Sequence, residues 1–267
     1  MLRPALFRPV LFRPAVTRFA PSGSVRPRAA RSRVVPVVVI ATGALLLGLT
    51  GCSEPMPVKP SATPSSTALP APTGDGLLRI GTMFPMTGDT AASGAAQVAG
   101  SQVAAREIDS QGGVLGQPIQ LIHRNSAGDE PAALADLTAR AVDAVLWDAG
   151  SAVRPEVPAS VAPAALLPLN ELVNGGTPLA AGEDFAQRLR MADPGLTDTA
   201  GGAEAYDGVI ATALAAMVTG DDGAGSIETG WVTVRQGPTV CTSWGECLLA
   251  LSEGQHIEYQ GITGSQS

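Results

Sequence analysis

Cysteine and histidine, the residue types that most often supply nucleophiles, bases or metal ligands, are rare in this chain. Its 267 residues include three Cys and two His. The chain has no Gly-x-Ser-x-Gly motif, so no serine has that nucleophile setting. His123 and His256 offer little for a catalytic triad, and Cys52, Cys241 and Cys247 offer little for a zinc cage. We therefore expect no enzymatic activity, no metal site and no cofactor.

Cys52 ends a segment with the pattern of an export signal. Residues 1–51 hold eight Arg and no acidic residue, and 34–51 form a nearly unbroken apolar run behind this basic lead. Basic, then apolar, then small residues is the order of a secretory signal. The run closes on Leu49-Thr50-Gly51-Cys52, which matches the bacterial lipobox, whose cysteine is acylated and becomes the new N-terminus. The length of the run would also allow an uncleaved membrane anchor. We predict a signal peptide over 1–51 and a lipid-anchored protein on the outer face of the cell membrane.

Residues 52–76 read as a stalk behind the lipidated cysteine. The segment is rich in Pro, Ser, Thr and Ala, and such a composition buries too little apolar surface to fold. A Pro-rich chain of this kind is a semi-rigid spacer. We expect it to hold a folded body, residues 77–267, away from the membrane.

The two remaining cysteines fit an exported protein, and the charge of the chain after residue 51 argues against a nucleic-acid partner. Cys241 and Cys247 are six residues apart, and in an oxidising compartment a disulfide is the default, with two free buried thiols as the alternative. After residue 51, nine basic residues face all 24 acidic ones, a net charge of −15. Such a body lacks the cationic surface that neutralises phosphates.

Apolar patterns along the body alternate between strand-like and helical. Residues 90–111 place Ala96, Gly100, Val103 and Ile108 on one stripe of a helix that ends at Gly112-Gly113. We expect strands over 77–84, 119–123, 143–147, 164–169 and 231–234, and further helices over 130–141, 183–191, 203–218 and 244–253. This alternation predicts an α/β fold: an open, mostly parallel sheet with helices on both faces. Ligands bind such sheets at the carboxyl ends of the strands.

Several segments resemble the type 1 periplasmic binding proteins, in the leucine/isoleucine/valine-binding branch that serves ABC importers. The similar segments are Ile80-Gly81 to Gly88, Ala105-Arg106-Glu107-Ile108, Gly112 to Ile119, Asp143 to Leu146 with Ser151, Ala203 to Asp207, and Cys241 to Leu248 with His256 to Gly261. The resemblance implies one Rossmann-like lobe, a C-terminal disulfide and no catalysis. The family has two lobes that close on a ligand, and most of the second lobe has no counterpart here.

The resemblance also implies which residues meet a ligand. Ser151, with the backbone N–H groups near Gly150, corresponds to the turn that receives a carboxylate. Ser93 stands where the family often has an aromatic residue, and Asn170 follows the fourth strand. Tyr206 belongs to a late helix. Ser151, Asn170 and Tyr206 each have a plain structural alternative: a capping serine, a solvated loop and a core aromatic, respectively.

These observations favour a solute-binding lipoprotein of an ABC-type importer, in shortened form. The implied ligand is an amino acid or a similar small carboxylate, and the implied partner is an ABC permease. Two alternatives remain: an envelope lipoprotein that uses the fold as a sensor or interaction module, and a degenerate remnant that binds nothing.

Overall fold

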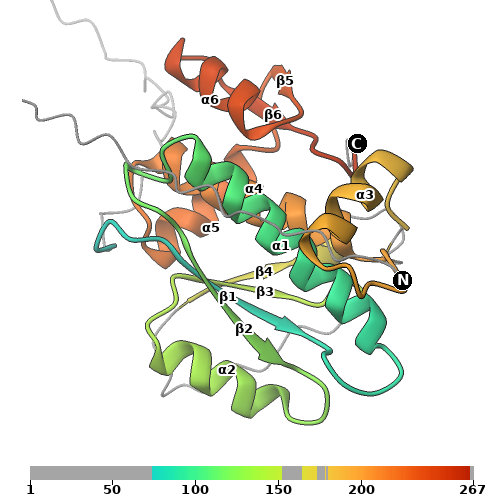
Figure 1. Cartoon of the computed structure of the whole chain (residues 1–267). Helices are drawn as coiled ribbons and strands as arrows, with labels where there is room; N and C mark the ends of the chain where they lie inside the picture. The colour runs from blue at the N-terminus through green and yellow to red at the C-terminus, as the bar shows by residue number, and fades with distance from the viewer. Residues whose placement is uncertain (1–73, 152–163, 173–177, 179, 265–267) are drawn as a thin grey trace, which may run out of the picture. The chain divides into compact units, whose positions relative to one another are not determined.

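The structure is a computed structural model that describes residues 74–151, 164–172, 178 and 180–264. Four strands form its main sheet: β1 (Arg79–Phe84), β2 (Gln120–Asn125), β3 (Ala144–Trp147) and β4 (Ala165–Pro168). They are all parallel, in the order β2-β1-β3-β4 (Figure 1). The chain moves outward from β1 first to β2 and then to β3, so the sheet is wound in both directions. The sequence pattern predicts an open, mostly parallel sheet, and this prediction is confirmed.

Alternate side chains of the inner strands enter two separate cores. In β3, Ala144 and Leu146 face one core while Val145 and Trp147 face the other, and all four are buried. A strand covered on both faces must be apolar along its whole length, which is why these runs lack polar alternation.

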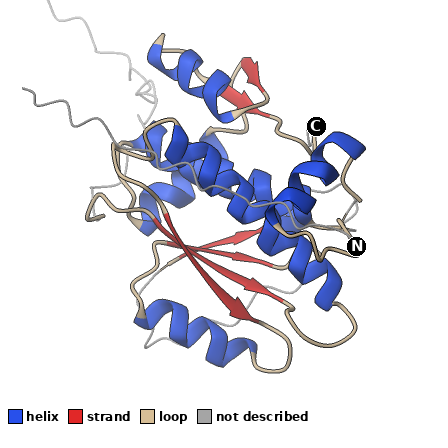
Figure 2. Ribbon diagram, in the orientation of Figure 1, coloured by secondary structure: helices blue, strands red, loops and turns tan. Residues whose placement is uncertain are grey.

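Helices cover both faces of the sheet (Figure 2). One face carries α2 (Glu130–Ala139), whose Leu134 and Leu137 pack on β1 and β3. The opposite core includes residues of the other helices. These are α1 (Ala91–Ser110), α3 (Glu183–Ala192), α4 (Gly202–Thr219), α5 (Ala224–Thr233) and α6 (Trp244–Ser252), with the short 3-10 helix η1 (Leu169–Leu172) after β4.

Helices α1 and α4 approach each other closely through glycine. A Cβ atom on Gly100 would lie 2.0 Å from the carbonyl oxygen of Gly202. The two backbones therefore pack without side chains between them at this point. The predicted stripe of α1, including Ala96 and Val103, is buried here as expected.

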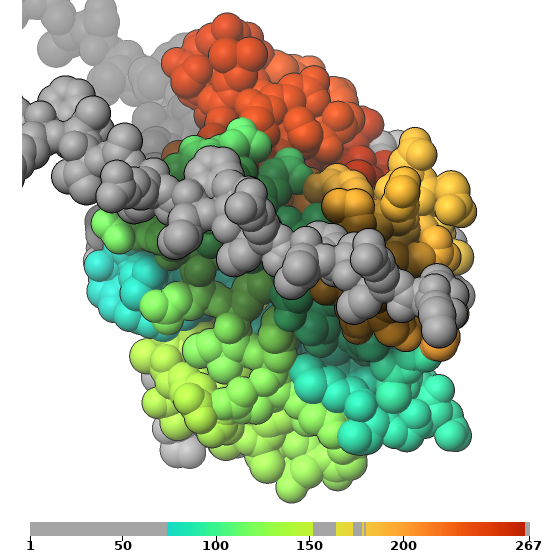
Figure 3. Space-filling view, viewed as in Figure 1, coloured from blue at the N-terminus to red at the C-terminus, as the bar shows by residue number. Residues whose placement is uncertain are grey.

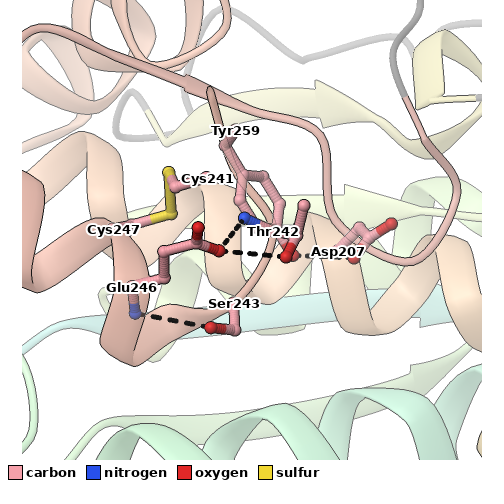
Figure 4. The surroundings of a disulfide bond; sticks show 7 residues. All are labelled: Asp207, Cys241, Thr242, Ser243, Glu246, Cys247 and Tyr259. Carbon is pink, nitrogen blue, oxygen red and sulfur yellow. Dashed lines mark hydrogen bonds between the residues drawn. A yellow bond between two sulfur atoms is a disulfide. The ribbon is translucent and has the colours of Figure 1, made fainter. Parts of the chain in front are cut away.

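The C-terminal part forms a second, small sheet that the sequence analysis missed. Strands β5 (Thr239–Cys241) and β6 (Ile257–Tyr259) pair in parallel, with α6 between them in the chain. These elements gather at the top of the space-filling view, in red (Figure 3). The expected disulfide joins Cys241 at the end of β5 to Cys247 in α6 (Figure 4). Ser243 caps α6 by accepting a hydrogen bond from the Glu246 N–H, 3.4 Å away, as the sequence indicates.

The strand expected over 231–234 is wrong. Residues up to Thr233 belong to α5, and a Cβ on Gly230 would lie 2.5 Å from the carbonyl oxygen of Ala215 in α4. Close helix packing on α4 overrides the β-forming residues of this segment.

Asp221 and Asp222, which follow α4, are both buried. Their carboxylates accept hydrogen bonds from the backbone N–H groups of Gly74 and Gly76, each 3.0 Å away. Nearby, burial raises the pKa of Asp143 to about 6. These acids hold the start of the described chain at the amino end of the sheet, opposite the expected ligand edge.

Candidate functional site at the carboxyl edge of the sheet

The strand ends bring three loops to one edge of the sheet. Asp148 follows β3, Pro85 follows β1 and η1 follows β4. The first turn of α1 closes against this edge, because a Cβ on Gly94 would lie 1.9 Å from the carbonyl oxygen of Pro85. The Gly94 N–H is not available to a ligand, because it donates to the carbonyl of Thr90 at 3.0 Å.

The side chain of Gln97 in α1 connects this helix to the turn after β3 through hydrogen bonds. Its side chain is fully buried. Its Nε2 donates to Asp148 Oδ1 at 2.6 Å, and its Oε1 accepts from the Ala149 N–H at 3.1 Å. A Cβ on Gly201 would lie 2.8 Å from Gln97 Cγ, so the segment before α4 also packs against it. One amide thus fixes the turn after β3 to α1.

The turn after β3 is organised around Asp148. Its Oδ1 also accepts from the Gly150 N–H at 3.1 Å, and its backbone carbonyl accepts from the Ser151 N–H at 3.0 Å. The two N–H groups that the resemblance offers to a ligand carboxylate therefore already have an acceptor. Within the described residues, both hydrogen bonds to the Asp148 side chain end on Oδ1. Oδ2 is left as the acceptor that this turn presents.

Asn125 fixes the loop after β1 through hydrogen bonds of its side-chain amide. Its Oδ1 accepts from the N–H groups of Met86, at 2.8 Å, and Ala127, at 3.0 Å, and its Nδ2 donates to Thr87 Oγ1 at 2.9 Å. Two of the loops that border the edge are thereby held by buried or half-buried amides, so little ordering would be needed when a ligand binds there.

Four of the five expected ligand-contacting residues lie around this edge. Ser93 is in the first turn of α1, where its hydroxyl donates to the Ala200 carbonyl at 3.0 Å. Gly150 and Ser151 form the turn after β3, and Asn170 is half-buried in η1 after β4.

Tyr206 lies elsewhere. Its side chain is 1% exposed, and its hydroxyl donates to Glu107 Oε2 at 2.8 Å. Glu107 is 14 residues beyond Ser93 on α1, which is about 21 Å along the helix axis at 1.5 Å per residue. The structure therefore places this tyrosine in the core between α1, α3 and α4, away from the strand ends.

The edge is electrostatically negative. Beside Asp148, Glu171 of η1 follows β4, and its carboxylate accepts from Arg235 at 3.3 Å. The described residues supply no second ion pair with Glu171, and none with Asp148. An ammonium group is the natural partner of the Asp148 carboxylate.

His123 makes its side-chain contact within the sheet and not at the carboxyl edge. Its Nδ1 lies 2.7 Å from Thr82 Oγ1 across the β1–β2 pair. Burial and the neighbouring Arg124 lower the pKa of His123. The imidazole is thus neutral at pH 7. In the described ranges, no group of three or more His, Cys, Asp or Glu is placed to hold a metal ion.

Sequence reasoning missed Gln97 and Asp148, the two residues that build the turn. The signal for Gln97 was a long amide on the apolar side of α1, next to Ala96. Asp148 could have been noticed as an acidic residue directly after a wholly apolar strand. The sequence pattern alone does not indicate which residue it contacts.

Comparisons with known proteins give one family match and several similar solved structures. The family described as periplasmic binding protein matches residues 78–182. A search of curated proteins gives no match. Similar solved structures include the branched-chain amino acid transporter substrate-binding protein LivJ from Streptococcus pneumoniae in complex with isoleucine, at 13% identity, 71% of this chain, 91% of that chain and a TM-score of 0.43. Another is a putative branched-chain amino acid ABC transporter from Silicibacter pomeroyi, at 15% identity, 60% of this chain, 84% of that chain and a TM-score of 0.41.

The matched segment contains all four strands of the main sheet and the loops of the candidate edge. It ends just before α3. The matched family is one of binding proteins, not of enzymes. The similarity to the periplasmic binding protein family thus lies in this sheet-bearing segment, residues 78–182.

Proposed function

We propose that the chain is a solute-binding lipoprotein of an ABC-type importer, in shortened form, and that it takes amino acids or similar small carboxylates at the carboxyl edge of its sheet. The observation that carries the proposal is the family match over 78–182, the segment that forms this edge. The fixed turn at Asp148 supports it, because a binding edge gains affinity when its groups are ordered before the ligand arrives.

The polar groups of the edge suit a small zwitterion. Its ammonium group would lie against Asp148 Oδ2, and its carboxylate would meet Ser151 and Asn170. Ser93 and Gly150 border the same space. A single lobe shields a ligand from water less than two closing lobes do, so we expect weaker binding than that of a two-lobed relative.

Tryptophan fluorescence tests this binding directly. Trp147 is 5% exposed and immediately precedes Asp148, so a ligand at the turn should change its emission. We expect a saturable change with at least one member of a panel of the twenty amino acids. Asp148→Asn should weaken that binding at least about tenfold, since the amide oxygen stays with the Gln97 and Gly150 donors and the ammonium group loses both the Oδ2 acceptor and the negative charge.

Two variants separate the outcomes of this titration. Trp147→Phe should remove the signal, while Trp244→Phe, in the C-terminal part, should preserve it. If no amino acid gives a saturable change while the protein still unfolds cooperatively, solute binding is refuted and the sensor or interaction module takes its place.

Attachment to the membrane is the second part of the proposal. Cys52 lies outside the described residues, and its lipidation is inferred from the lipobox. Among the residues described, no helix has the length and apolar character to cross a membrane. The family relationship supports a location outside the cytoplasm, next to the ABC permease that would receive the solute.

Metabolic labelling tests the anchor. We expect radioactive palmitate to enter the full chain when it is expressed in a bacterium with lipoprotein processing, and Cys52→Ser to abolish the label. The control is the double variant Cys241→Ser/Cys247→Ser, which should retain it. Label that persists in Cys52→Ser would show that the lipobox assignment is wrong.

A further inference from the structure

One arginine of the described chain has no acidic partner, although acids far outnumber bases there. The six other described arginines each make an ion pair with Asp or Glu. Arg106 of α1 is exposed, and its contact with a side chain of the described residues is a 3.4 Å hydrogen bond to Gln102. Because residues 52–267 carry a net charge of −15, an unneutralised guanidinium is unexpected on electrostatic grounds.

A second arginine, Arg188 of α3, lies close to Arg106, and neighbouring side chains fix the position of its guanidinium group. Its guanidinium carbon is 5.2 Å from the ring centres of both Phe185 and Tyr206. Its Nη2 donates to Glu107 Oε2 at 2.8 Å, and Tyr206 donates to the same oxygen. Within the described residues Glu107 is the one carboxylate that Arg188 contacts, so the guanidinium has N–H groups left for an added carboxylate.

The two guanidinium groups border a cavity between α1 and α3. The cavity has a volume of about 290 Å³ and is lined by Val103, Arg106, Glu107, Arg188 and Met191. Helix α3, in gold, stands at the surface of the molecule (Figure 3). Met191 is 75% exposed, the highest fraction among the large apolar side chains described. Val103 and Met191 give the cavity apolar walls, one from each helix.

We propose that this cavity binds a small carboxylate that bears an aliphatic chain. Two arginines and one glutamate give the lining a net charge of +1, and a guanidinium pairs with a carboxylate in a planar, two-bonded geometry. The aliphatic part covers Val103 and Met191 and removes their apolar surface from water. The volume is at the lower end for ligand pockets, so the ligand is small. The site is separate from the strand-end edge and does not depend on the proposed function.

The charge and the walls together exclude other classes of ligand. An amine of the same length would place its charge beside two guanidinium groups and be repelled. Inorganic phosphate carries the right charge but has no apolar part to cover Met191. The site therefore requires both the carboxylate and the chain.

Hexanoate and hexylammonium form a matched pair of probes for this site. We expect hexanoate to bind the full chain saturably in ligand-observed NMR titrations and hexylammonium not to bind. Arg106→Gln should weaken hexanoate binding about fivefold, because one guanidinium partner is lost. Met191→Ser should weaken it about threefold, because the exposed wall becomes polar. Arg190→Gln, on the same helix but outside the cavity, should leave the affinity unchanged.

Arg106 is the variant of choice because it has no ion pair in the fold, whereas replacing Arg188 also disturbs Glu107 and Tyr206. Asp148→Asn, at the strand-end edge, should leave hexanoate affinity unchanged, which separates this site from that of the proposed solute. The proposal is overturned if hexanoate does not bind, if hexylammonium binds equally well, or if Arg106→Gln binds hexanoate as the original chain does.

Discussion

Replacing Gln97 by Leu is expected to lower the free energy of unfolding by about 3 kcal/mol, because it leaves a half-buried carboxylate and a buried backbone N–H without their hydrogen bonds to Gln97. The Asp148 carboxylate loses the 2.6 Å bond from Nε2, and the Ala149 N–H loses its acceptor at 3.1 Å. Leu has nearly the volume of Gln, so the loss reports on polar contacts and not on a cavity. Urea unfolding followed by circular dichroism measures it.

The same substitution should remove solute binding at the edge, even under conditions in which the variant is fully folded. Without Gln97, Asp148 is no longer held toward α1, and the turn at Gly150 must be ordered by the ligand itself. The matched control is Gln102→Leu, on the same helix, whose side chain accepts one long hydrogen bond from Arg106. We expect that variant to change stability by less than about 0.5 kcal/mol. A Gln97→Leu protein as stable as the control would show that Gln97 does not fasten the turn.

Replacing Asp207 by Ala is expected to cost about 4 kcal/mol of stability, the larger of the two losses. Asp207 is 1% exposed. Its oxygens accept from the Tyr259 hydroxyl at 2.7 Å, the Ile262 N–H at 2.9 Å, and the N–H and hydroxyl of Thr263, each at 2.7 Å. Removing the carboxylate leaves these four donors without an acceptor and releases the turn after β6 from α4.

Two substitutions that remove fewer hydrogen bonds to Asp207 should lower the stability by less. Tyr259→Phe and Thr263→Val each remove side-chain donors but keep the carboxylate, so each should cost about 1 kcal/mol. Because Tyr259 lies in β6 and the disulfide joins the neighbouring strand β5 to α6 (Figure 4), the fluorescence of Trp244 at the start of α6 should report the loosening of this part. If Asp207→Ala is no less stable than Thr263→Val, the four bonds do not hold the C-terminal turn.

The elements that could be predicted from the sequence are those with a long, regular apolar pattern. Helix α1 and the first three strands follow from periodicity, since a buried parallel strand and a helix with one apolar stripe each leave a distinct local pattern. The end of α1 at Gly112 and the cap at Ser243 are equally local, because each depends on a residue and its near neighbours.

Short elements in the C-terminal part were not predictable in this way. The run Trp231 to Val234 has strand-forming residues, yet Trp231 and Thr233 belong to α5, which packs on α4 at Gly230. Strands β5 and β6 have three residues each, too few to show a period. Their state depends on the partner they meet, and the partner is distant in the sequence.

The same distinction between local patterns and distant contacts applies to the candidate site. The sequence by itself determined that an α/β sheet exists, that its strand ends meet at one edge, and that Ser93, Gly150, Ser151 and Asn170 lie around that edge. Each of these follows from the order of elements in the chain. Only the tertiary structure decided that Gln97 and Asp148 build the turn and that Tyr206 is buried beside Glu107. Hydrogen bonds between residues some 50 or 100 positions apart depend on how the helices dock, and no local pattern carries that information.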